Sequence, residues 1–114
     1  MTDPLGSFSR LGALKDATMA DTLYERIEQH VREAEAKLTA GEALTLYHYL
    51  PNGEAITVTS IGYHNPYLMR FYGTDGQGNE CDVLVHFAST HLVLRRTAAS
   101  GPQKRRIGFT GDSV

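Results

Sequence analysis

The residues of this chain that could do chemistry lie mostly between positions 81 and 96. Cys81, His86 and His91 are separated by steps of five residues. Metal sites usually need closely paired ligands, and in an extended strand a step of five places side chains on opposite faces. No Ser-His-Asp arrangement and no pair of carboxylates stands out. The sequence therefore predicts no metal ion, no other cofactor and no enzymatic activity.

Contacts with nucleic acid are the second kind of chemistry that the residue types allow. Aromatic side chains can stack on bases, and arginine and lysine side chains can bind phosphates. Each group also has a simpler explanation, because aromatic residues pack barrels and interfaces, and a basic tail can simply be solvated. The aromatic candidates, dense on the first and third predicted strands, are Tyr47, Tyr49, Tyr63, Tyr67, Phe71 and Tyr72, and the clustered basic candidates are Arg95, Arg96, Lys104, Arg105 and Arg106.

The charge of the chain is unevenly distributed. Its net charge of −2 does not by itself indicate nucleic acid as a partner. Residues 1–90 hold 6 basic and 12 acidic side chains, a net of −6, whereas residues 91–114 hold 5 basic and 1 acidic, a net of +4. Such an asymmetry can mark a contact patch or a basic tail.

Length and composition predict one domain in a reducing compartment. A chain of 114 residues has one domain by default, and its single cysteine excludes an intrachain disulfide. No apolar run approaches the roughly 20 residues of a membrane span, and the N-terminal residues lack the pattern of a secretory signal. We therefore expect a cytoplasmic protein that does not bind a membrane.

One helix is expected before residue 41, where Gly41 suits a C-cap. Thr22 and Glu25 fit a capping box at its start. Steps of three and four residues predict an amphipathic helix that packs against a sheet. Its apolar stripe consists of Leu23, Ile27, Val31, Ala34 and Leu38.

Alternation and turn residues predict five short strands after the helix, at about 43–50, 54–61, 67–73, 81–87 and 91–96. Sequential strands with short connections pair antiparallel, and five of them readily close into a barrel. The predicted fold is mainly β with one N-terminal helix and a five-stranded antiparallel small β-barrel. The predicted organisation is a flexible segment at 1–20, the helix and barrel at 21–97, and a flexible basic tail at 98–114.

The stretch Leu84-Val85-His86-Phe87-Ala88-Ser89-Thr90 resembles the Sm-like family, in particular its bacterial Hfq branch. That branch has Tyr-Lys-His-Ala-Ile-Ser-Thr just before a short last strand, so His86, Ser89 and Thr90 match. Asn52-Gly53 also matches a turn that is common in the family. The resemblance covers residues 22–96.

The resemblance implies a homo-oligomeric ring that binds single-stranded RNA. Strands four and five would lie on the edges of each subunit and pair with neighbours, and five to seven copies would close the ring. His86 would line the central pore, although it could equally be a half-buried strand residue with one hydrogen bond. The RNA-binding residues implied are His86, Tyr67, Asn65, Arg95 and Arg96.

A second function is a non-enzymatic oligomeric barrel with a protein-binding or structural role. Val85 stands where the family has a lysine, and residues 1–90 are net acidic. Both features weaken the phosphate contacts that give most nucleic-acid binders their affinity. They favour this second function, whereas the strand plan and the His-x-x-Ser-Thr match favour the first.

Overall fold

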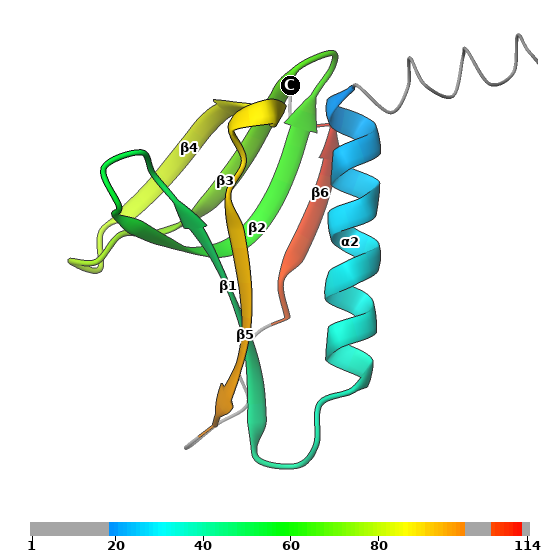
Figure 1. Ribbon diagram of the computed structural model, residues 1–114, viewed down its shortest axis with the longest axis vertical. Coiled ribbons are helices and arrows are strands. Elements are labelled where there is room, and N and C mark those ends of the chain that lie inside the picture. Colours follow the sequence, from blue (N-terminus) through cyan, green and yellow to red (C-terminus); the bar gives the residue numbers. More distant parts are fainter. Residues whose placement is uncertain (1–18, 100–105, 113–114) are drawn as a thin grey trace, which may run out of the picture.

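The structure, a computed structural model, describes residues 19–99 and 106–112 and places one helix against a sheet (Figure 1). The helix, α2, spans Ala20–Ala36, and a short 3-10 turn, η1, spans Phe87–Ser89. The strands are β1 (Glu42–Tyr49), β2 (Ala55–His64), β3 (Leu68–Thr74), β4 (Glu80–His86), β5 (Leu92–Ala98) and β6 (Gly108–Asp112).

The sheet has six strands, and its main path runs in the order β4-β3-β2-β1-β5 with antiparallel neighbours. The prediction of a mainly β domain with one helix and an antiparallel sheet is therefore confirmed. The sixth strand, β6, was not predicted and pairs parallel with β2. Among the described residues β4 and β5 are not paired with each other, so the sheet stays open and a closed barrel remains a prediction.

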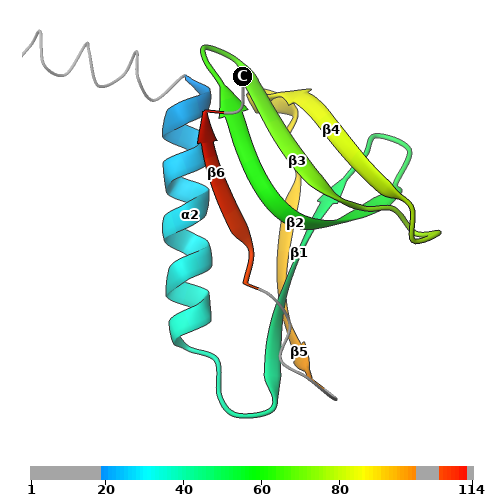
Figure 2. The ribbon, with the colours of Figure 1, turned by 180° about the vertical axis from the view of Figure 1, so that it is seen from behind.

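Strand β2 is shared along its length between two neighbours on the same side. Its first half pairs with β1 from Ala55 to Val58, and its second half pairs with β6 from Ser60 to Tyr63. The first half of β1 pairs with β5 alone. Both views show β1 and β5 diverging from the helix while β6 lies between α2 and β2 (Figures 1 and 2).

The helix begins and ends at residues other than those predicted. It starts at Ala20, so Thr22 lies inside its first turn and the predicted capping box is wrong. The turn between β2 and β3 satisfies the first backbone donors instead: the N–H of Ala20 donates to the C=O of Pro66 at 2.8 Å, and that of Asp21 donates to Oδ1 of Asn65 at 3.1 Å. Residues distant in the sequence therefore cap the helix, and the predicted local motif does not.

The C-terminal end of the helix lies at Ala36, with Lys37 as the C-cap. Gly41 was predicted as the C-cap, but it forms the turn into β1 with a φ of 85°, a conformation that favours glycine. Leu38 therefore lies beyond the helix and is only half-buried. The buried positions of the helix are Ala20, Tyr24, Ile27 and Val31, which share Ile27 and Val31 with the predicted stripe.

The core lies between this helix face and the sheet. Its most deeply buried large side chains are Phe71, Ile61, Met69, His48 and Val31. His48 is the surprising member, because it is 1% exposed and stacks on Phe71 with ring centroids 4.8 Å apart. The core thus depends on contacts between β1, β2, β3 and α2.

The two predicted flexible ends also contain ordered residues. Ala20, placed in the flexible segment 1–20, is fully buried in the core. β6 lies within the predicted tail 98–114, and Ile107 directly before it is 5% exposed. A five-residue strand with two glycines has no alternation for sequence reasoning to detect. Residues 1–18, 100–105 and 113–114, and with them Lys104 and Arg105, lie outside the described residues.

Candidate nucleic-acid interface

Three aromatic rings stack where β3 begins and β4 ends. Tyr67 precedes β3, His86 is the last residue of β4, and Phe87 is the first residue of η1. The His86 ring lies 5.4 Å from the Tyr67 ring and 4.7 Å from the Phe87 ring, with interplanar angles of 19° and 25°. The rings of Tyr67 and Phe87 are 6.3 Å apart at 19°. We call these three side chains the aromatic platform.

Backbone pairing holds the platform in place. Leu68 of β3 pairs with His86 of β4, and the N–H of Phe87 donates to the C=O of Tyr67 at 2.8 Å. Nδ1 of His86 accepts a hydrogen bond from the N–H of Ala88 at 3.0 Å. In the neutral ring Nδ1 is therefore the acceptor and Nε2 carries the proton, so Nε2 is a donor for a ligand.

The platform is open to solvent on one side. Tyr67 is 56% exposed, His86 is exposed, and Phe87 is half-buried against the core. Stacking of a base on an aromatic ring is worth about 1–3 kcal/mol. The structure thus brings together two residues that the sequence singled out, Tyr67 and His86. It adds Phe87, which was not among the aromatic residues singled out from the sequence.

Asn65 lies in the same turn as Tyr67 but serves the helix. Its Oδ1 accepts the N–H of Asp21, and the carbonyl of the next residue, Pro66, accepts the N–H of Ala20. One of the two lone pairs of this oxygen is therefore engaged in capping the helix. The observed role of Asn65 is structural, and its predicted contact with RNA stays untested.

Arg95 and Arg96 lie on β5, away from the platform. Arg95 pairs with Thr45 and Arg96 with Leu44 of β1. β5 leaves η1 at Leu92 and runs toward the opposite end of the sheet (Figure 1). The guanidinium of Arg95 lies over the ring of Tyr47 at 5.9 Å, so this arginine has an aromatic partner of its own outside the platform.

The structure describes three of the five basic residues that the sequence grouped together: Arg95 and Arg96 on β5, and Arg106 before β6. Arg106 lies at the entrance to β6, where its Nη2 is 3.1 Å from Oε1 of Glu35. At the other end of β6, Oδ1 of Asp112 lies 3.5 Å from Nδ1 of His64. The platform itself includes no lysine or arginine, and among the described residues Arg95, Arg96 and Arg106 all lie on or beside other strands.

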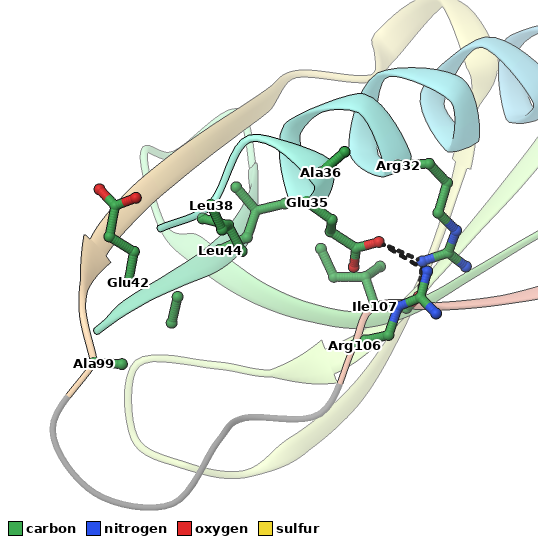
Figure 3. A pocket seen from close by; sticks show the side chains of 10 residues that line it. Arg32, Glu35, Ala36, Leu38, Glu42, Leu44, Ala99, Arg106 and Ile107 are labelled. Atoms are coloured by element: carbon green, nitrogen blue, oxygen red, sulfur yellow. Dashed lines mark hydrogen bonds and ion pairs between the residues drawn. The ribbon is translucent and has the colours of Figure 1, made fainter. Parts of the chain in front are cut away.

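A pocket of about 390 Å³ lies between the end of α2, the start of β1 and the entrance to β6 (Figure 3). Leu38, Leu44 and Ile107 contribute apolar walls, and Arg32 and Arg106 both donate to Oε1 of Glu35, at 2.9 and 3.1 Å. Burial acts to raise the pKa of Glu35, but these two hydrogen bonds outweigh it, so the pKa of that carboxyl lies below its ordinary value. Sequence reasoning did not find this pocket, because its residues come from four segments, at 32–38, 42–44, 99 and 106–107.

In the part of the chain that the structure describes, no group of three or more histidine, cysteine, aspartate or glutamate side chains could hold a metal ion. No helix in residues 19–99 or 106–112 is long and apolar enough to cross a membrane.

Comparison with known proteins gives no family for this chain: no family model matches it, and neither a curated protein nor a solved structure matches it.

Proposed function

We propose that the chain is an Sm-like protein that assembles into a closed ring of five to seven copies and binds single-stranded RNA. The observation that carries the proposal is the aromatic platform, an exposed stack of Tyr67, His86 and Phe87. Single-stranded bases stack on such rings irrespective of sequence, and Nε2 of His86 offers a hydrogen-bond donor beside them.

The two end strands of the open sheet support assembly. β4 and β5 occupy opposite ends of the strand order, as the Sm-like resemblance implies. Val83 and Val85 of β4 and Leu92 and Leu94 of β5 are only half-buried although they pack on the core. Pairing of β4 with β5 of the next copy would satisfy both edges and cover these side chains.

Assembly would also bring positive charge close to the aromatic platform. A single copy separates the platform from Arg95 and Arg96. Pairing of β4 with a neighbouring β5 would bring the arginines of that neighbour alongside the strand that ends at His86. The RNA phosphates would then contact one copy while the bases stack on the next.

The test is fluorescence anisotropy with labelled oligo-U and oligo-A at two salt concentrations, together with light scattering. We expect scattering to report an oligomer, and Tyr67→Ala to weaken binding while leaving the salt dependence nearly unchanged. A matched control is Leu84→Ala, because Leu84 is 61% exposed on β4, the strand that ends at His86, but its side chain lies outside the platform. His86→Ala should behave like Tyr67→Ala.

Charge is tested separately with the double variant Arg95→Gln, Arg96→Gln. It should flatten the salt dependence, by about 0.7 log units per lost phosphate contact. Deleting residues 101–114 would not serve this purpose, because the deletion also removes β6. A stable monomer in scattering, or no RNA binding at tens of micromolar in low salt, would refute the proposal.

The second candidate function is an oligomeric β protein with a protein-binding or structural role. The absence of lysine and arginine from the platform and the valine at position 85 favour it. It predicts an oligomer without measurable affinity for RNA, so the same two measurements separate the candidates.

A further inference from the structure

Strand β6 sits in its groove in the way that a bound peptide does. It pairs with β2 through backbone groups and lies between β2 and α2 (Figures 1 and 2). Parallel pairing cannot be made through a tight turn, and Gly108 is 48 positions beyond its partner Ser60. None of the contacts of β6 therefore depends on a short connection to the strand that it pairs with.

The helix contacts the strand through side chains. Nη1 of Arg32 donates to the C=O of Ile107 at 3.3 Å, and the guanidinium lies 4.8 Å from the centre of the Phe109 ring. The hydroxyl of Tyr24 accepts the N–H of Gly111 at 2.9 Å, and its ring meets Phe109 edge-on at 5.6 Å. Together Arg32 and Tyr24 contact the strand along most of its length.

The groove also selects side chains of the strand. Ile107 is 5% exposed within the core cluster, and Phe109 packs against the same cluster. Gly111 has a φ of 75°, a conformation that a residue with a side chain rarely adopts. The recognised pattern is therefore an isoleucine, any small residue, a phenylalanine and, two positions later, a glycine.

An ion pair marks one end of the groove, and a contact between a carboxylate and an imidazole marks the other. At the entrance Arg106 meets Glu35 (Figure 3), and at the exit Asp112 meets His64. The side chain of Arg106 is 71% exposed, whereas that of Glu35 is 14% exposed, so the acidic partner belongs to the groove and the basic partner to the strand. This arrangement fixes the direction in which a strand can enter.

From these contacts we propose that the groove between α2 and β2 is a peptide-binding site, and that it accepts residues 106–112 from a second copy of this chain as well as from its own. An identical segment makes identical contacts, so exchange between copies costs no interaction that the groove provides. Within one chain the segment has an effective concentration on the order of millimolar, which favours self-occupancy in dilute solution. Exchange then links copies through a surface other than the edges of β4 and β5.

The first experiment measures the affinity of the groove for a peptide. The probe is a labelled peptide with the sequence of residues 106–112, RIGFTGD, titrated into the full chain carrying Phe109→Ala and into the unaltered chain. We expect the variant to bind the peptide at least tenfold more tightly, because its own strand competes less. The control peptide RIGATGD should not bind either protein.

A second variant decides the outcome if Phe109→Ala does not fold. The double variant Arg106→Gln, Asp112→Asn weakens the strand at both ends and alters two exposed side chains. It too should bind RIGFTGD more tightly than the unaltered chain does. Absence of peptide binding to a folded variant at several hundred micromolar overturns the proposal.

The second experiment tests exchange between copies. Full chains labelled at the N-terminus with a donor or an acceptor dye are mixed at about 100 µM, a concentration chosen to favour association. We expect energy transfer that excess RIGFTGD lowers to the level given by edge pairing alone and that RIGATGD leaves unchanged. Transfer that RIGFTGD leaves unchanged overturns exchange but preserves the ring, because edge pairing of β4 and β5 does not use the groove. Absence of any transfer overturns both.

Discussion

Replacing Gly73 by alanine should separate β3 from β2. Gly73 lies opposite Val58 of β2, beside the point where the register between these strands shifts. A Cβ atom at Gly73 would overlap the carbonyl oxygen of Thr57 and would lie 2.8 Å from its carbonyl carbon and 3.0 Å from Cα of Val58. All three obstacles are backbone atoms, so no side-chain rotation can relieve the overlap.

The cost follows from what must move. Phe71 and Met69 on the same strand are fully buried, so β3 cannot shift away from β2 without disturbing the core. Loss of two ladder hydrogen bonds costs about 1–3 kcal/mol, and forced repacking of a filled core costs about 1–3 kcal/mol more. The expected total of roughly 2–6 kcal/mol is a large share of the 5–15 kcal/mol that stabilises a typical domain.

Gly76 provides the matched control. It lies in the loop between β3 and β4, and a Cβ atom there would meet nothing within 4 Å. Gly76→Ala should therefore leave the free energy of unfolding within about 1 kcal/mol, and a gain is possible because alanine restricts the unfolded chain. Urea denaturation followed by far-ultraviolet circular dichroism measures both variants.

The difference in stability between Gly73→Ala and Gly76→Ala tests whether β2 and β3 lie as close together as the structure shows. A fall of about 2 kcal/mol corresponds to a loss of roughly 8–16 °C in Tm for a domain of this size. If Gly73→Ala unfolds at the same urea concentration as Gly76→Ala, then β2 and β3 do not approach as closely at Thr57 as the structure places them.

Two further predictions concern buried positions. Burial lowers the pKa of His48 and outweighs its hydrogen bond to the backbone of His91, which raises that pKa. As the pH falls below about 6.5, the imidazole is therefore protonated in the unfolded chain before it is protonated in the folded chain. Thermal melts should show stability falling from pH 7 to pH 5.5, by at most about 1.4 kcal/mol per pH unit for this group, and His48→Gln should flatten that slope. Val31→Asp should abolish cooperative melting because Val31 is 1% exposed, whereas Leu38→Asp should cost much less; equal melting temperatures would show that the two side chains are equally buried.

Strands with alternating polarity were predicted well, because a half-buried sheet imposes a period of two on the sequence. The five strands from β1 to β5 lie close to the predicted ranges. The limits of the helix were not predicted correctly, because Asn65 and Pro66, more than 40 positions away, supply its N-terminal cap. A local motif such as Thr22 with Glu25 cannot show that a distant turn will take over its role.

The candidate site was predicted only in part for the same reason. Tyr67 and His86 meet because β3 and β4 form a hairpin, and short-range pairing of this kind can be read from the sequence. β6 was missed, because its parallel pairing with β2 joins segments that are far apart in the chain. Its residues Ile107 and Phe109 have partners in the helix that no periodicity indicates.

The turn between β2 and β3 couples the parts of the molecule that the proposals concern. Within four consecutive residues, His64 faces Asp112 of β6, Asn65 and Pro66 cap α2, and Tyr67 begins the aromatic platform. Movement of this turn would therefore affect the end of the peptide groove, the start of the helix and the stacked rings together. Exchange of β6 between copies replaces the contact of His64 with Asp112 by the same contact to a second copy, and it leaves the backbone bond from Phe87 to Tyr67 in place. Strand exchange and base stacking are thus compatible in one assembly, and each can be lost without the other.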